Sequence, residues 1–93
     1  MAEIVSTLNL RNRFEILKVE MQSPDLLTDE DFNMVERYVA SNPLFTHFRY
    51  LTGMRRYSDG HYFTYYLCSK SPRKRVSQTD LDMIKSIIDF SQI

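Results

Sequence analysis

The dipeptide Asp59-Gly60 is the feature that most constrains how this 93-residue chain folds. Asp-Gly favours a two-residue type I′ turn, because both central residues of that turn adopt positive φ. The stretches on either side, residues 44–57 and 62–69, are rich in aromatic residues and Thr. Such residues suit the pleated, half-buried surface of a β-strand. The sequence therefore predicts a β-hairpin with Asp59-Gly60 at its tip.

This turn also sets the register of the predicted hairpin. Tyr57 then pairs with Tyr62, and the side chains alternate between two faces. The expected core face carries Tyr50, Thr52, Met54, Arg56, Phe63, Tyr65 and Leu67. The opposite face carries Arg49, Leu51, Gly53, Arg55, Tyr57, Tyr62, Thr64, Tyr66 and Cys68. We call this second set the tyrosine–arginine face. It is the candidate exposed surface, and in this register the Tyr66 ring lies opposite Gly53.

Residues 9–22 are predicted to form a helix. Four apolar residues recur at spacings of four, three and four, which places them on one helical face: Leu10, Phe14, Leu17 and Met21. Helix-forming residue types dominate the segment, and Pro24 ends it. A strand is the alternative, because Leu17, Val19 and Met21 also alternate with polar residues.

Two further helices are predicted from their N-cap residues. The first follows Thr28 and stops before Pro43. Its apolar stripe consists of Phe32, Val35, Tyr38 and Val39. The last helix follows Thr79, which we take as its N-cap. Its buried face consists of Leu81, Ile84, Ile87 and Ile88.

The predicted order of elements is α-α-β-β-α. This order indicates a small α+β fold in a single domain spanning residues 1–93, with the β-hairpin packed against helices. A two-stranded ribbon has little stability of its own. Either the helices cover it or a second copy of the chain extends it, so a homodimer is a candidate assembly.

Charge is unevenly distributed along the chain, although 12 basic and 12 acidic residues cancel overall. Residues 1–41 hold four basic and eight acidic residues, a net charge of −4. Residues 42–77 hold seven basic residues and one acidic residue, a net charge of +6. Residues 78–93 hold one basic and three acidic residues, a net charge of −2. The neutral total excludes a histone-like polycation and an acidic mimic of DNA, but it permits a local basic surface.

The +6 segment also holds eight of the twelve Phe and Tyr residues. Aromatic rings stack on unpaired bases, and Arg and Lys neutralise phosphates. The candidate binding residues are Arg49, Arg55, Arg56, Tyr57, Tyr62 and Tyr66 on the hairpin, with Lys70, Arg73, Lys74 and Arg75 in the loop that follows. We expect a non-enzymatic binding or regulatory protein whose partner is nucleic acid, contacted as a single strand or through its backbone. The alternative is an inhibitor or adaptor that docks an acidic protein surface, since protein interfaces also favour Tyr and Arg.

The sequence does not favour a catalytic or metal site. A Cys–His pair needs hydrogen-bond contact, and the predicted register separates Cys68 from His61. Cys68 is instead expected to be a small buried apolar residue. The spacing of His47, His61 and Cys68 matches no zinc site, so no cofactor is expected. RNA cleavage is the enzymatic alternative, and its candidate residues are Arg55, Arg56, Tyr57 and His61.

The single cysteine excludes an intramolecular disulfide framework. It favours a reducing, intracellular compartment, either cytoplasmic or nuclear. No apolar run approaches the length of a membrane span. The first ten residues lack the basic start and apolar core of a signal peptide.

Overall fold

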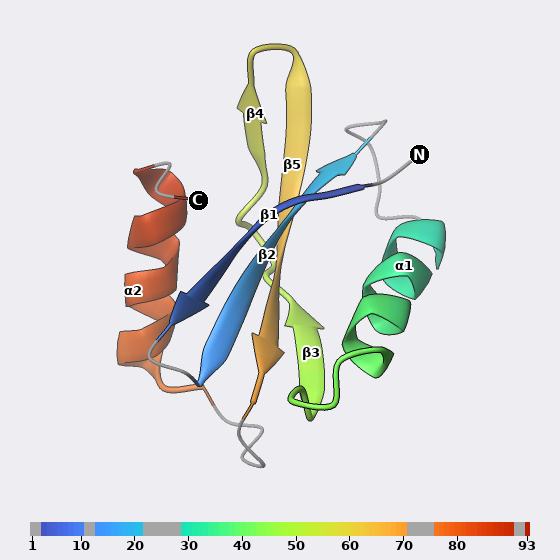
Figure 1. Cartoon of the computed structure of the whole chain (residues 1–93). Helices are drawn as coiled ribbons and strands as arrows, with labels where there is room; N and C mark the ends of the chain where they lie inside the picture. Colours follow the sequence, from blue (N-terminus) through green and yellow to red (C-terminus); the bar gives the residue numbers. More distant parts are fainter. Residues whose placement is uncertain (1–2, 11–12, 22–28, 71–75, 91–92) are drawn as a thin grey trace.

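The computed structural model describes residues 3–10, 13–21, 29–70, 76–90 and 93 (Figure 1). Its elements are β1 (Glu3–Leu10), β2 (Phe14–Met21), α1 (Asp29–Ala40), β3 (His47–Tyr50), β4 (Arg56–Ser58), β5 (His61–Ser69) and α2 (Gln78–Asp89). The observed order is β-β-α-β-β-β-α, so the predicted order α-α-β-β-α is wrong. The mixture of helices with an antiparallel hairpin is confirmed.

The five strands form one sheet in the order β1-β2-β5-β3, and β4 also pairs with β5. All of these pairings are antiparallel. β2 runs along one side of β5, whereas β3 and β4 share the other side. The centre of the sheet is therefore built by β2 and β5, which lie far apart in the sequence.

The predicted helix over residues 9–22 is wrong, because this part of the chain holds the end of β1 and all of β2. β2 is buried on both faces. Phe14 and Ile16 point to one face, and Leu17, Val19 and Met21 point to the other. A strand buried on both faces loses the simple alternation of apolar and polar residues. In β2 the apolar residues therefore also recur at the spacing expected for one face of a helix.

The two helices cover opposite faces of the sheet (Figure 1). α2 packs on a cluster that we call the α2 core: Phe14, Ile16, Leu51, Tyr65, Leu67, Ile84 and Ile88. α1 packs on a cluster that we call the α1 core: Leu17, Val19, Val35, Phe45, Tyr66 and Cys68. The sheet therefore separates two cores, and each helix seals one of them.

The turn at the tip of the hairpin is confirmed. Asp59 and Gly60 have φ angles of 52° and 83°, and Tyr57 pairs with Tyr62. Further from the tip the predicted register is wrong. Tyr50 pairs with Tyr66, three residues away from the partner that an uninterrupted ladder would give it.

A second turn causes this change of register. The Met54 N–H donates to the Leu51 carbonyl at 3.3 Å, and Gly53 has a φ of +80°. This turn splits the first hairpin strand into β3 and β4. The shift is an odd number of residues, so the residues of β3 lie on the face opposite to the predicted one. Gly53 is therefore not opposite Tyr66.

The other two predicted helices are confirmed, with changes at their ends. α1 buries Val35 but leaves Phe32 46% exposed, and Thr28 lies outside the described residues. α2 begins at Gln78, and its N-cap is Ser77, whose hydroxyl accepts a hydrogen bond from the Asp80 N–H at 3.1 Å. The prediction that Thr79 is the N-cap is therefore wrong. Neither helix in the described part of the chain is long and apolar enough to cross a lipid bilayer.

Candidate binding surface

The predicted tyrosine–arginine face does not exist as one exposed surface. Tyr66 is fully buried in the α1 core, with its ring 5.5 Å from that of Tyr50. Burial raises the pKa of Tyr66 to about 12. Arg49 lies on the other side of the sheet, since it pairs with Leu67 of the α2 core. The prediction failed here because it assumed one exposed face, whereas a helix covers each face of this sheet.

The tip of the hairpin does keep an exposed aromatic group. Met21 pairs with Tyr62, and Tyr62 pairs with Tyr57, so the three side chains form a row across three strands on one face. The Tyr57 and Tyr62 rings lie 4.9 Å apart between centroids. Tyr57 is 64% exposed, whereas Met21, at the other end of the row, is 6% exposed. The exposed Tyr57 ring and its neighbour Tyr62 thus present an aromatic surface to solvent, and Met21 is buried beside them.

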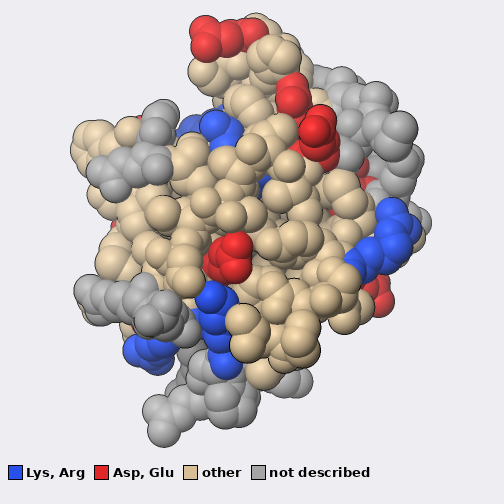
Figure 2. Space-filling model, in the orientation of Figure 1, with Lys and Arg blue, Asp and Glu red and all other residues tan. Residues whose placement is uncertain are grey.

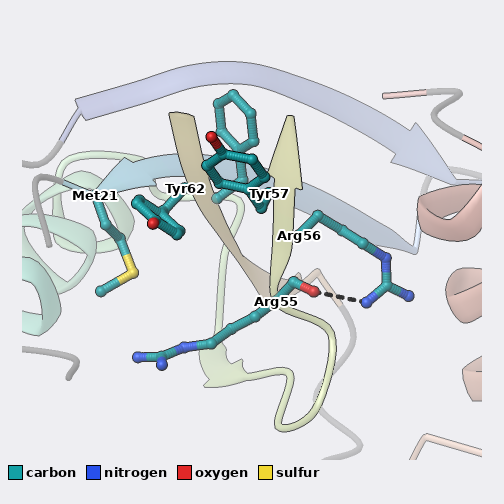
Figure 3. Close-up of a pocket in the computed structure, with 6 residues that line it drawn as sticks. Met21, Arg55, Arg56, Tyr57 and Tyr62 are labelled. Atoms are coloured by element: carbon teal, nitrogen blue, oxygen red, sulfur yellow. Dashed lines mark hydrogen bonds between the residues drawn. The ribbon is translucent and has the colours of Figure 1, made fainter. Parts of the chain in front are cut away.

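These side chains surround a pocket of about 240 Å³, lined by Met21, Arg55, Arg56, Tyr57, Tyr62 and Phe63. We call it the tip pocket. In Figure 3 the side chains of Met21, Tyr57, Tyr62 and Arg55 lie around one hollow. The pocket is smaller than the roughly 300–1,000 Å³ of sites for drug-sized ligands. It therefore suits one flat ring or one side chain.

The two neighbouring arginines of the tip point in different directions. Figure 3 shows Arg55 beneath Tyr62 and Met21, and Arg56 extending away from the tyrosines. Arg56 donates to the Arg55 carbonyl at 2.7 Å and forms an ion pair with Asp89 in the last turn of α2. Both arginines line the tip pocket, and the Arg56 guanidinium also faces an acid of the same chain.

The other predicted basic residues are distributed over the molecule. Arg49 is exposed on β3. Lys70 lies at the opposite end of β5 from the tip, with its ammonium 5.9 Å from the centre of the Phe45 ring. Arg73, Lys74 and Arg75 lie outside the described residues. On the face seen in Figure 2, the described Lys and Arg side chains are scattered among uncharged ones and do not merge into one patch.

The candidate catalytic residues are not brought together in the described part of the chain. Cys68 is fully buried, and burial raises the pKa of its thiol to about 12, so it is not a thiolate at neutral pH. His61 begins β5 and contacts Glu20. His61 therefore lies on the face opposite to Tyr62 and Tyr57, which divides the residues named for RNA cleavage.

The described residues hold no group of three or more His, Cys, Asp or Glu side chains arranged to bind a metal ion. His47 is hydrogen-bonded to its neighbour, since its Nδ1 lies 2.8 Å from the Thr46 hydroxyl oxygen.

Two members of the tip pocket, Met21 and Phe63, are absent from the candidate binding residues of the sequence. Phe63 is assigned there to the core face of the hairpin, and Met21 to a helix over residues 9–22. The alternation of Leu17, Val19 and Met21 was the signal for a strand ending beside the hairpin tip.

Comparison with protein-family models, curated proteins and solved structures finds no match.

Proposed function

We propose that this protein is a small binding module that holds single-stranded nucleic acid at the tip pocket. The observation that carries the proposal is the exposed Tyr57 ring, supported by Tyr62 and Met21 and flanked by Arg55. An unpaired base stacks on such a ring, and each stacked base contributes about 1–3 kcal/mol. Arg55 lines the same pocket, and its positive charge makes it the candidate contact for the adjacent phosphate.

The shape of the site favours a single strand over a duplex. Bases inside a duplex are stacked on one another, so they do not present a free face to Tyr57. The pocket accepts one ring, and no helix of the described chain carries a cluster of Arg, Asn and Gln for reading a major groove. Binding is therefore expected to be weakly dependent on base sequence.

The test is a fluorescence-anisotropy titration of the full chain with labelled single-stranded and duplex oligonucleotides at low and moderate salt. The single strand is expected to bind more tightly, and its affinity should fall as salt rises. The logarithmic slope is expected to be about −0.7 for each phosphate neutralised. Intact RNA after incubation would separate binding from the cleavage that the enzymatic alternative requires.

Matched variants locate the site. Tyr57→Ala should weaken binding by about 1–3 kcal/mol, whereas Phe90→Ala, which removes another highly exposed ring, should have no effect. Arg55→Ala should weaken binding and reduce the salt slope, whereas Arg37→Ala on α1 should change neither. Charge reversal of Arg73, Lys74 and Arg75 tests whether these residues also contribute to binding of the nucleic acid.

Three results would contradict the proposal: no binding at low salt, binding that is insensitive to salt, or full binding by Tyr57→Ala. Purification with a stoichiometric protein partner and no nucleic acid would support the alternative, an adaptor for an acidic protein surface.

A further inference from the structure

β3 forms one edge of the sheet. Among the described strands it pairs only with β5. The Leu51 N–H donates to the Tyr65 carbonyl at 2.9 Å, so Leu51 and Arg49 direct their backbone groups toward β5. In an antiparallel ladder the residues between them point the other way. The N–H and C=O groups of Phe48 and Tyr50 therefore face away from β5.

An open groove of about 420 Å³ runs between this edge and α1. α1 contributes Glu36, Val39 and Ala40 to one wall, and β3 contributes Phe48 to the other. The loop between them closes one end with Pro43. The lining is mainly apolar and holds one acidic side chain, Glu36.

Two exposed apolar residues lie next to residues that line the groove. Phe32 is 46% exposed and lies against Phe48, with 5.1 Å between the ring centroids. Leu44, which follows Pro43, is 63% exposed. Apolar surface gathered beside an unpaired strand edge is the arrangement that recognises an extended peptide by strand addition.

We infer that this groove binds an extended segment of a partner protein, which adds to β3 as a further antiparallel strand. Phe48 and Tyr50 exchange backbone hydrogen bonds with two apolar residues of the peptide, whose side chains lie on the α1 side of the sheet. The peptide residue between these two apolar residues lies opposite Arg49, which is exposed on the other face of the sheet. An acidic residue at that position pairs with Arg49 across the two strands.

The charges of this chain disfavour a second copy as the occupant. If β3 paired with β3 of a second copy, the register that matches Phe48 with Tyr50 would place Arg49 directly opposite Arg49. Like charges in that position are destabilising. β1 of a second copy carries one acidic residue, Glu3, at its first position, so an antiparallel register with Glu3 opposite Arg49 pairs β3 with only the first three residues of β1. We therefore take a segment of a different protein with the pattern apolar–acidic–apolar as the occupant, and the surface is distinct from the tip pocket.

The test uses the blocked heptapeptide Ser-Val-Glu-Val-Thr-Lys-Ser, titrated into the full ¹⁵N-labelled chain and followed by NMR. The amide resonances of Phe48 and Tyr50 should shift, whereas those of Tyr57 and Tyr62 should not. N-methylation of both valines removes the N–H groups that face β3 and should weaken binding by at least about tenfold. N-methylation of the peptide's glutamate removes an N–H that points away, and it should leave the affinity almost unchanged.

A charge exchange tests the pairing with Arg49. Arg49→Glu should weaken binding of this peptide. The same variant should bind tightly the peptide that carries Lys in place of Glu. Lys85→Glu, an exposed charge reversal on α2, should change neither affinity.

Three results would overturn the inference. The amide resonances of Phe48 and Tyr50 could stay unshifted at millimolar peptide, or the peptide methylated at both valines could bind as tightly as the unmethylated one. The third is an Arg49→Glu variant with the same preference between the Glu and Lys peptides as the wild type. Sedimentation showing a dimer that the peptide cannot dissociate, or an oligonucleotide that shifts Phe48 and Tyr50, would overturn it as well. Loss of oligonucleotide binding at the tip would leave this result unaffected, so the two proposals fail separately.

Discussion

At the residue scale, the Tyr66 hydroxyl is one of three buried side-chain oxygens without a hydrogen-bond partner in the described part of the chain. The side chain is fully buried in the α1 core, and no described residue hydrogen-bonds to its hydroxyl. A buried hydroxyl without a partner costs roughly 1–3 kcal/mol of desolvation. The aromatic ring contributes more than this, since it contacts the rings of Phe48 and Tyr50. Tyr66 therefore contributes to stability through its ring and not through its oxygen.

Tyr66→Phe tests this assignment. The variant keeps the ring and removes the unpaired hydroxyl, so its free energy of unfolding is expected to be unchanged or higher by about 1 kcal/mol. Tyr66→Ala removes the ring as well and should cost about 3–5 kcal/mol. Urea denaturation followed by circular dichroism measures both. A loss of more than 1 kcal/mol in Tyr66→Phe would mean that the hydroxyl has a favourable partner.

The same burial makes stability depend on alkaline pH. Burial raises the pKa of Tyr66 from 10.0 and that of Cys68 from 9.0, in each case to about 12. Below pH 9 both groups keep their protons whether the chain is folded or unfolded. At higher pH the unfolded chain releases protons that the folded chain retains, so stability falls as pH rises toward 12.

The expected slope is up to about 1.4 kcal/mol per pH unit for each group that ionises only in the unfolded chain. Urea midpoints measured from pH 7 to pH 11 should therefore decline above pH 9, and Tyr66→Phe should reduce the decline above pH 10. A flat profile would contradict the burial of these two groups.

At the element scale, the Leu51–Met54 turn decides which residues of the hairpin face which helix. Gly53 holds a φ of +80°, and a Cβ placed there would meet no atom within 4 Å. The cost of Gly53→Ala is therefore conformational, and we expect a loss of about 1–2 kcal/mol in the free energy of unfolding. Gly53→Asn should lose less, because Asn tolerates the left-handed region. Urea denaturation compares the two, and equal stability of Gly53→Ala and wild type would show that the turn adopts another geometry.

The elements that could be predicted from the sequence are those whose signals are local. The Asp59-Gly60 turn and the helix that contains Ile84 and Ile88 follow from short-range rules for turns and for amphipathic spacing. The local signal of β2 was ambiguous: Leu17, Val19 and Met21 alternate as in a strand, but apolar residues occur on both of its faces and also match the spacing of a helix. β1 did carry a signal, since its half-buried residues are Ile4, Ser6, Leu8 and Leu10, at alternate positions.

The residues of the tip pocket also differ in whether a local sequence signal predicts them. Tyr57, Tyr62 and Arg55 were predicted from the hairpin alone and line the tip pocket. Met21 completes the pocket only through the pairing of β2 with β5, which no local pattern encodes. Tyr66 was misplaced for a related reason: the exposure of a hairpin face depends on which helix packs over it. Pairing between distant segments is therefore the information that sequence patterns lack here.

At the scale of the whole molecule, the central question is whether the two cores unfold together. The α2 core contains Ile84 and the α1 core contains Val35, and the sheet separates them. Both cores are nevertheless built on the same two strands, because side chains of β2 and β5 alternate between them. Loss of either helix exposes one face of the central strand pair, so we expect a single cooperative transition.

Ile84→Ala and Val35→Ala test this expectation. Each variant should lose roughly 2–4 kcal/mol through the cavity it leaves. Since the two side chains share no contacts across the sheet, the losses should add to within about 0.5 kcal/mol in the double variant. Tyrosine near-ultraviolet circular dichroism reports on all six tyrosines, of which Tyr65 and Tyr66 are buried in different cores, and the far-ultraviolet signal reports on both helices. The two signals should give the same urea midpoint in each variant. Far-ultraviolet and tyrosine transitions with different urea midpoints in Ile84→Ala would show instead that the two cores unfold separately.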